Sequence, residues 1–431
     1  MAKLVGELGF PADFLWGAAT AGHQVEGDNR NSDWWAWEQR PDSPIAEPSG
    51  ATCEHLTRYP EDVALLAGAG LNTYRYSVEW SRIEPSEGNF DDEALTHYRR
   101  MTQTVVDAGV TPMVTLNHFT VPQWFAERGG WMSRDAAVVF GRYCERVVRA
   151  IGDLVPWWCT INEPGNVAVG GYLGALGWPP GTHGYGDWKR AARGLTEGHR
   201  RALAVVKSLH PSARVGATHG MIEWEPSTAA KPAVDQVRRM FEDAFLDVCG
   251  DDDYLGVQTY TRLPVPLPVW LTPAVYAAMA VGPVREQLLP RLIRQATHNF
   301  GEGEATPAEG LRTTQMGYEF RPESIAATLR RAASLYPGKD LVVTEHGVAT
   351  SDDTERVEFI RRGVSAVHQV MEAGLPVRGY LYWSLLDNFE WTLGYRPTFG
   401  LIGVDRNTQE RSVRASLGVL GDIAKRGRLT V

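Results

Sequence analysis

The sequence has few cysteines and no dense run of basic residues. Its four cysteines, Cys53, Cys144, Cys159 and Cys249, lie too far apart for a CxxC motif or another close metal-ligand spacing. We therefore interpret them as reduced structural thiols. The formal charge is −9 at pH 7, and the Lys and Arg residues form no cluster that could follow a phosphate backbone. Nucleic acid is therefore not an expected partner.

The sequence also lacks an apolar run that could span a membrane. The longest candidate, Leu263 to Ile293, is interrupted by several prolines and by Arg285 and Glu286. Before Phe14, Glu7 interrupts the one stretch that could form the apolar region of a signal peptide. We expect a cytoplasmic protein without a membrane partner.

The chain is 43% apolar over 431 residues, which is enough for a large core. Short β-branched or aromatic runs alternate with segments of helical period, as in parallel strands joined by crossover helices. Eight runs are predicted to be strands: Phe14–Ala19, Thr73–Ser77, Thr111–Asn117, Trp157–Asn162, Val215–His219, Tyr254–Thr259, Leu341–Glu345 and Gly379–Ser384. No flexible linker separates them. The sequence therefore predicts an α/β fold, a single (β/α)8 TIM barrel with elaborated βα loops, in one domain over residues 1–431.

Two segments between the strands carry clear helix signals. Ser133–Ile151 begins at a Ser that could cap a helix, and its apolar residues recur at spacings of three and four. Pro322–Tyr336 has a proline in its first turn and is followed by a Pro-Gly stop. Both are predicted to be helices packed on the barrel.

Polar side chains recur where the predicted strands end. In a (β/α)8 barrel these ends meet at one mouth, where active sites are found. The residues at or just after the ends are Gln24, Arg75, Glu79, His118, Asn162, Glu163, Gln258, Tyr260, Glu345, His346, Trp383, Glu390 and Trp391. We expect them to gather at one site.

Glu163 and Glu345 are carboxylates that follow apolar strands. An apolar wall disfavours the charged carboxylate, whereas a nearby Arg75 or amide favours it, so the two environments can separate an acid from a base. Such a pair can protonate a glycosidic oxygen and either attack the sugar carbon or activate water. Taken alone, each Glu could equally form a salt bridge or a helix cap.

Tryptophans recur near the predicted strand ends, where the two carboxylates also lie. Those near predicted strand ends are Trp34, Trp35, Trp37, Trp80, Trp124, Trp131, Trp383 and Trp391. Aromatic faces can stack on the apolar face of a sugar, although each Trp alone is more often part of a core. Together with the carboxylates they favour a sugar site.

Five motifs, in order along nearly the whole chain, resemble those of glycoside hydrolase family 1, the β-glucosidase family. They are FLWGAAT at 14–20 with QVEG at 24–27, TINEP at 160–164, VTEHG at 343–347, YWSLLDNFEW at 382–391 and FGLI at 399–402. The resemblance implies a retaining β-glycosidase that needs no cofactor and no metal.

The resemblance also implies a role for each matching residue. Glu345 would attack the anomeric carbon, held by Tyr260 and Arg75, and Glu163 would act as acid and then as base. Asn162 would bond the sugar 2-hydroxyl. The remaining substrate-binding residues would be Gln24, His118, Gln258, Trp383, Glu390, Trp391 and Phe399.

Certain positions limit the substrate that the resemblance implies. Glu390 replaces the Ser of the 6-phosphoglycoside branch, and its charge would repel phosphate. Glu163 is not the Gln of the thioglucosidase branch. Gln258, His23 and Phe119 depart from the usual Asn, Tyr and Trp. Unphosphorylated glucosides, galactosides and fucosides remain open as substrates.

Other activities remain open at this point. A transglycosidase that hands the sugar to an alcohol would use the same residues, and an inverting hydrolase would differ in the separation of its carboxyl groups. A non-catalytic sugar-binding barrel is disfavoured because both carboxylates are present. The oligomeric state and the aglycone are not predicted.

The apolar segment Leu263–Ile293 is unlike the usual family loop. It could be a helical hairpin packed on the barrel, or an apolar wall for the leaving group. The second alternative predicts bulky hydrophobic aglycones in place of a second sugar.

Overall fold

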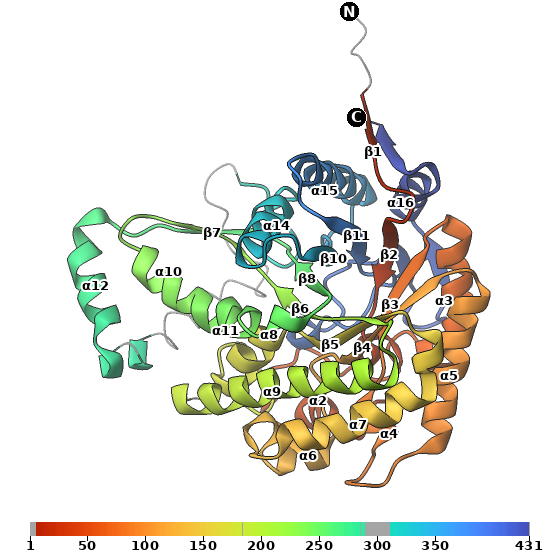
Figure 1. Cartoon of the computed structure of the whole chain (residues 1–431), viewed down its shortest axis with the longest axis horizontal. Coiled ribbons are helices and arrows are strands. Elements are labelled where there is room, and N and C mark those ends of the chain that lie inside the picture. Colours follow the sequence, from red (N-terminus) through yellow and green to blue (C-terminus); the bar gives the residue numbers. More distant parts are fainter. Residues whose placement is uncertain (1–5, 183, 285, 289–310, 431) are drawn as a thin grey trace, which may run out of the picture.

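Eight parallel strands close into a barrel at the centre of the molecule (Figure 1). The computed structural model describes residues 6–182, 184–284, 286–288 and 311–430. Around the barrel, with β11 returning to β2, the strands are β2 (Leu15–Ala19), β3 (Thr73–Ser77), β4 (Thr111–Asn117), β5 (Trp157–Asn162), β6 (Arg214–Gly220), β8 (Tyr254–Gln258), β10 (Asp340–His346) and β11 (Val377–Trp383). Their bounds lie within two residues of the predicted ones, which confirms the (β/α)8 barrel.

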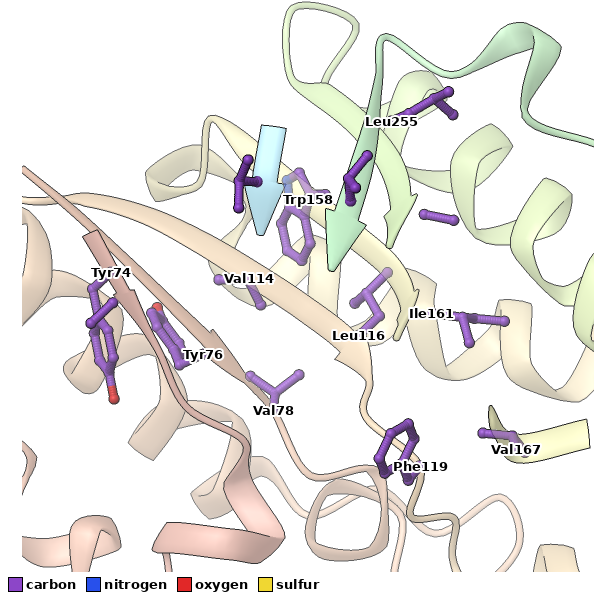
Figure 2. Close-up of a cluster of buried hydrophobic side chains, with 14 of the residues drawn as sticks. Tyr74, Tyr76, Val78, Val114, Leu116, Phe119, Trp158, Ile161, Val167 and Leu255 are labelled. Carbon is purple, nitrogen blue, oxygen red and sulfur yellow. The ribbon is translucent and has the colours of Figure 1, made fainter. Parts of the chain in front are cut away.

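Successive side chains along the barrel strands alternate between two apolar clusters. One cluster contains a residue from each of six strands: Leu15, Met113, Cys159, Tyr254, Val342 and Leu381. Their sequence neighbours, such as Trp16, Val114 and Leu255, belong to the larger cluster between the barrel and its helices. Figure 2 shows part of this larger cluster around Val114, Leu116 and Trp158. Side chains with period two therefore fill both sides of each strand.

Helices cover the outside of the barrel. The longer ones are α3 (His55–Ala69), α5 (Asp92–Asp107), α7 (Ala136–Ile151), α9 (Tyr185–Leu209), α14 (Ser324–Leu335), α15 (Asp353–Glu372) and α16 (Ala415–Arg426). None of the helices in the described ranges is long and apolar enough to cross a membrane. All four cysteines are buried free thiols, as predicted.

The two predicted helices are present, but both begin later than expected. Helix α7 begins at Ala136 because Ser133 donates its hydroxyl to the carbonyl of Arg128 and does not cap the helix. Helix α14 begins at Ser324, two residues after Pro322. Their predicted apolar faces are buried: Val139, Phe140, Tyr143, Val147 and Ile151 in α7, and Ile325, Leu329 and Ala332 in α14.

Short elements decorate the barrel. The two-stranded sheets pair β1 (Glu7–Gly9) with β14 (Arg428–Thr430), β7 (Glu223–Pro226) with β9 (Arg262–Val265), and β12 (Ile402–Val404) with β13 (Arg411–Val413). The short helices are α1 (Gly22–Val25), α2 (Asp33–Glu38), α4 (Trp80–Ile83), α6 (Gln123–Glu127), α8 (Pro164–Val167), α10 (Lys231–Arg238), α11 (Ala244–Leu246) and α12 (Thr272–Ala280). Helix α12 packs beside α10 at the left edge of Figure 1, away from the barrel.

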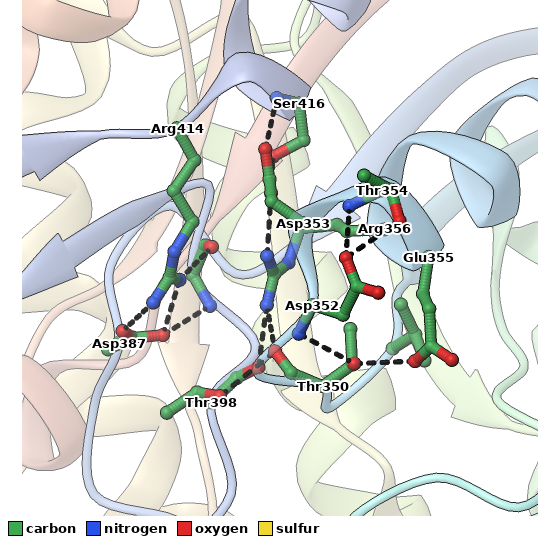
Figure 3. A network of polar contacts seen from close by, with 12 residues as sticks. Thr350, Asp352, Asp353, Thr354, Glu355, Arg356, Asp387, Thr398, Arg414 and Ser416 are labelled. Carbon is green, nitrogen blue, oxygen red and sulfur yellow. Dashed lines mark hydrogen bonds and ion pairs between the residues drawn. The ribbon is translucent and has the colours of Figure 1, made fainter.

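Polar contacts tie the loop after β11 to the C-terminal part of the chain (Figure 3). Arg414 donates to both carboxylate oxygens of Asp387, a geometry that holds a planar pair in one orientation. Buried Arg356 donates to the carbonyl of Thr398. Both arginines therefore anchor the stretch that contains Glu390.

Candidate active site

The C-terminal ends of the strands surround a cavity of about 470 Å3, which we call the mouth cavity. The predicted site residues that line it are Gln24, His118, Glu163, Tyr260, Glu345, Trp383, Glu390, Trp391 and Phe399. Arg75 and Asn162 are fully buried behind this surface, and Gln258 borders a neighbouring cavity. The barrel therefore brings together residues from widely separated parts of the sequence.

Two strand-end residues do not belong to this group. Glu79 accepts hydrogen bonds from the amide of Asn29 and the hydroxyl of Thr120, in a buried network beside the cavity. His346 is next to Glu345 on a strand and therefore points the other way, where it contacts Tyr380. For these two residues, the expectation of a shared site is wrong.

Glu163 is held at the turn between β5 and α8. Its backbone is in the left-handed region, with φ of 42°, and Pro164 follows at the first position of α8. A left-handed Glu is uncommon, and residues of this kind gather at functional sites. The backbone N–H of Glu163 donates to the carbonyl of Thr218, and Asn166 donates to its carboxylate. These contacts aim the carboxyl group into the cavity.

Glu345 lies near the end of β10, on the strand face that points into the barrel. Its carboxylate accepts hydrogen bonds from the guanidinium of Arg75 and, over 2.5 Å, from the hydroxyl of Tyr260. Charge-assisted hydrogen bonds to both oxygens stabilise the ionised form. This is the environment that a carboxylate nucleophile requires.

The two carboxyl groups have different electrostatic surroundings. Burial raises the pKa of Glu163 well above its usual value, and the negative charge of Glu345 raises it further. Burial also raises the pKa of Glu345, but there Arg75 and Tyr260 act in the opposite direction. The pair therefore favours a protonated Glu163 beside an ionised Glu345.

The buried residue Asn162 links Arg75 to His118. The side-chain oxygen of Asn162 accepts from Arg75 over 2.6 Å and from Gln258 over 2.9 Å, so its NH2 group must face His118 Nε2, 3.2 Å away. Burial and the charge of Arg75 lower the pKa of His118 well below its usual value, so the ring is neutral. Since Nε2 accepts, Nδ1 carries the proton and offers a donor that has no partner among the described residues.

Gln24, Trp383 and Glu390 add further polar groups and an aromatic face to the lining of the mouth cavity. The Gln24 side chain donates to Asn388 and to the carbonyl of Phe389, and its oxygen has no partner in the described ranges. Glu390 is buried beside the ring nitrogen of Trp383, and burial raises the pKa of Glu390 well above its usual value. Acceptors and a donor among aromatic faces suit a molecule with several hydroxyl groups on an apolar ring.

Most of the tryptophans considered from the sequence do not reach this cavity. Of the eight, Trp383 and Trp391 line it, and Trp34 packs behind Trp391. Trp80 and Trp131 are core residues, because they stack among Phe125, Phe140 and Tyr143. Several lining residues could not be predicted from the sequence: Asn166, Leu176, Trp178, Met316 and Tyr318. Asn166 lies in the one-turn helix α8 and the others lie in loops, where no periodic pattern marks them.

A buried group away from the mouth cavity has the chemistry of metal ligands. The ligand atoms of His199, Cys249 and Asp252 lie within 4.8 Å of one another. Burial, followed by the charge of Asp252, raises the pKa of the Cys249 thiol well above its usual value. The Cys249 thiol already contacts His219 and the carbonyl of Phe245, and His199 lies 3.0 Å from Asp252 as a polar pair. We assign the group no part in the site.

The carboxyl group of Glu163 leaves no room for a side chain at Gly220. A Cβ at position 220 would lie 2.7 Å from one carboxyl oxygen of Glu163. We expect Gly220→Ala to displace this group and lower kcat about 100-fold, since a shift of about 1 Å in a reacting group can have that effect. Steady-state kinetics on an aryl β-glucoside would measure it. Gly418→Ala on α16 is the matched control, because its Cβ meets no atom within 4 Å; equal kinetics for both variants would contradict the placement of Glu163.

Comparison with known proteins identifies the family. The model of glycosyl hydrolase family 1 matches residues 7–261 and 286–428. The chain is a member of glycosyl hydrolase family 1. It is thus a β-glucosidase-like O-glycosyl hydrolase, and the resemblance inferred from the five motifs is confirmed.

Relatives of this glycosyl hydrolase cover almost its whole length. Thermostable β-glucosidase B of Thermobispora bispora is 32% identical over 98% of this chain and 92% of its own. A bifunctional β-D-glucosidase/β-D-fucosidase of Bifidobacterium breve is 29% identical over 93% of this chain and 95% of its own. The β-glycosidase structure from Pyrococcus horikoshii has a TM-score of 0.84 and 33% identity over 98% of this chain and 96% of its own.

Proposed function

We propose that the chain, acting as one catalytic unit over residues 1–431, is a retaining β-glycosidase that hydrolyses an unphosphorylated β-glycoside. One observation carries the proposal: of the three buried carboxyl groups that border the mouth cavity, those of Glu163, Glu345 and Glu390, it is Glu345 that pairs with a guanidinium and a phenol within the described ranges. An inverting enzyme would need a base that activates water, and a carboxylate held by Arg75 and Tyr260 is better suited to attack carbon directly.

In the first step, a carboxylate oxygen of Glu345 bonds to the anomeric carbon while the bond from that carbon to the leaving oxygen breaks. The proton of Glu163 passes to the leaving oxygen. Arg75 and Tyr260 keep Glu345 ionised and oriented before the attack. In the second step, Glu163 takes a proton from water, the water oxygen bonds to the anomeric carbon, and Glu345 leaves as a carboxylate.

The sugar hydroxyls meet the unpaired groups of the mouth cavity. The ring proton of His118, the side-chain oxygen of Gln24 and the carboxyl group of Glu390 bind them, and the NH2 group of Asn162 serves the 2-hydroxyl. Glu390 is buried against Trp383, and within the described ranges it pairs with no cation that could also neutralise a phosphate, so it disfavours a phosphorylated sugar. The B. breve relative, named for both glucosides and fucosides, supports tolerance of more than one sugar.

Proton NMR during turnover of a panel of aryl β-glycosides tests this function. We expect unphosphorylated glucosides or fucosides to be cleaved and the β-anomer of the free sugar to appear first. An α-anomer as the first product would mean inversion, and preference for a 6-phosphoglycoside would overturn the role of Glu390. Product analysis with and without added alcohol measures the share of transglycosylation, because the alcohol glycoside then replaces free sugar.

We expect activity to follow a bell-shaped pH curve. The acid limb reports ionisation of Glu345. The alkaline limb reports loss of the proton of Glu163, whose pKa is raised well above its usual value by burial and by the charge of Glu345. Glu163→Ala should remove the alkaline limb for an activated aryl substrate. An unchanged limb in kcat/KM would assign that proton to another group.

A further inference from the structure

A second cavity of about 280 Å3, which we call the side cavity, adjoins the mouth cavity at Glu163. Its volume is close to the lower end of the range of about 300–1,000 Å3 that is typical of small-molecule sites. Glu163, Asn166, Leu176, Tyr260 and Tyr318 line both cavities. Among the residues that line the mouth cavity but not the side cavity are Gln24, His118, Glu345, Trp383 and Glu390, so Glu163 lies at the boundary between the two cavities. This position matches the leaving group, because Glu163 must contact the oxygen between sugar and leaving group.

The body of the side cavity is apolar. One wall is α10 with Ala233, Val234 and Val237, and the facing wall is the paired strands β7 and β9 with the residues that follow, among them Val265 and Leu267. The ring nitrogen of Trp224, which also lines it, already donates to Glu242 over 2.7 Å. The far end of the cavity therefore presents hydrocarbon.

Unpaired polar atoms gather at the end of the side cavity that meets Glu163. The side-chain oxygens of Asn166 and Gln258 are buried and accept no hydrogen bond from the part of the chain that the structure describes, and both residues line the cavity. This arrangement, polar at the cleaved bond and apolar beyond it, is complementary to a glycoside whose leaving group is a hydrocarbon.

The wall formed by β9 belongs to a segment that the family model leaves unmatched, residues 262–285. Leu263, Val265 and Leu267 of this segment line the side cavity. The next residues do not: Val269 and Trp270 are 70% and 77% exposed. The expected apolar wall is thus confined to the first residues of Leu263–Ile293, and α12 packs on α10 outside it; residues 285 and 289–293 lie outside the described ranges.

We propose that the side cavity binds the aglycone and selects glycosides of extended hydrocarbon alcohols over disaccharides. This inference rests on the proposed β-glycosidase function. A second sugar in the side cavity would bring hydroxyls that its walls leave unpaired, and each would weaken binding about 5- to 150-fold. A hydrocarbon chain gains about fourfold for each methylene that becomes buried.

A series of alkyl β-glucosides, from butyl to hexyl to octyl, tests the proposal with cellobiose as the comparison. We expect kcat/KM to rise at least tenfold from butyl to octyl and cellobiose to fall below octyl. A flat series, or cellobiose at or above octyl, would overturn it. If the proposed β-glycosidase function itself were wrong, 4-nitrophenyl β-glucoside would not be cleaved at all, which distinguishes that failure from a failure of the aglycone assignment.

Variants on the two walls test whether the side cavity causes the preference for longer alkyl chains. Val237→Phe fills the cavity from α10, and Val265→Asn places an amide on the facing wall; each should reduce the octyl-to-butyl ratio of kcat/KM at least fivefold. The ratio within one preparation does not depend on how much of a variant is folded. Trp270→Ser, on the exposed part of the same segment, is the matched control and should keep the ratio of the unaltered enzyme. An unchanged ratio in both wall variants would overturn the assignment.

Discussion

Replacing Glu345 by alanine should abolish turnover of every β-glycoside, with kcat/KM lower by more than about a thousandfold. Among the residues that line the mouth cavity, Glu345 is the carboxylate held ionised, because both of its oxygens accept charge-stabilising hydrogen bonds. Without it, no covalent bond to the anomeric carbon can form. The measurement is steady-state kinetics on 4-nitrophenyl β-glucoside together with a thermal melt.

The control for this variant is Glu372→Ala, which removes a carboxylate from the exposed end of α15. It should leave the kinetics unaltered. If Glu345→Ala kept more than about a thousandth of the activity while folded, Glu345 would not be the nucleophile.

Replacing Glu163 by alanine should affect substrates according to their leaving groups. Poor leaving groups need the proton of Glu163, so their first step should slow by about 10²–10⁴-fold. Activated aryl glycosides leave without a proton, and their first step should slow much less. Removing the side chain also makes room beside Asn166 and Gly220, where a small anion can reach the glycosyl-enzyme.

Azide should therefore restore turnover of Glu163→Ala and yield a β-glycosyl azide. Product analysis by NMR distinguishes the anomers. An α-azide, or the absence of any rescue, would show that Glu163 does not act as acid and base.

The barrel could be predicted from the sequence because each strand carries a local signal. The run Thr111–Asn117, for example, is a β-branched and apolar stretch between helical segments, and it forms β4 with those bounds. Helix starts were less predictable. Ser133 looks like a cap, but it bonds to Arg128, and no local pattern distinguishes these two uses of a hydroxyl.

The central residues of the site were predictable for a related reason. Glu163 and Glu345 stand at strand ends, where barrel geometry brings them together, and the family motifs identify them. The supporting residues depend on three-dimensional packing. Asn166 lies three residues after Glu163 and bonds to it, and Tyr318 comes from a distant loop. A glycine such as Gly220 matters because of the space it leaves, which no residue pattern encodes.

For the apolar segment Leu263–Ile293, composition alone does not predict which residues line a cavity. Its richness in Leu, Val and Pro was compatible with a packed helical hairpin or with an apolar wall, but β9 turns one part toward the side cavity while Val269, Trp270 and Tyr276 face solvent. Which part lines a cavity depends on the pairing of β9 with β7, a contact between strands that are distant in sequence.

Trapping of the glycosyl-enzyme is the most direct test of the account. A 2-deoxy-2-fluoro-β-glucoside with an activated leaving group should add one sugar to the protein, and peptide mass spectrometry should place that sugar on Glu345 alone. Removal of excess reagent should be followed by slow recovery of activity as water releases the sugar. A label on any other residue, or full inactivation without a covalent adduct, would contradict the assignment of Glu345 as the nucleophile of a retaining β-glycosidase.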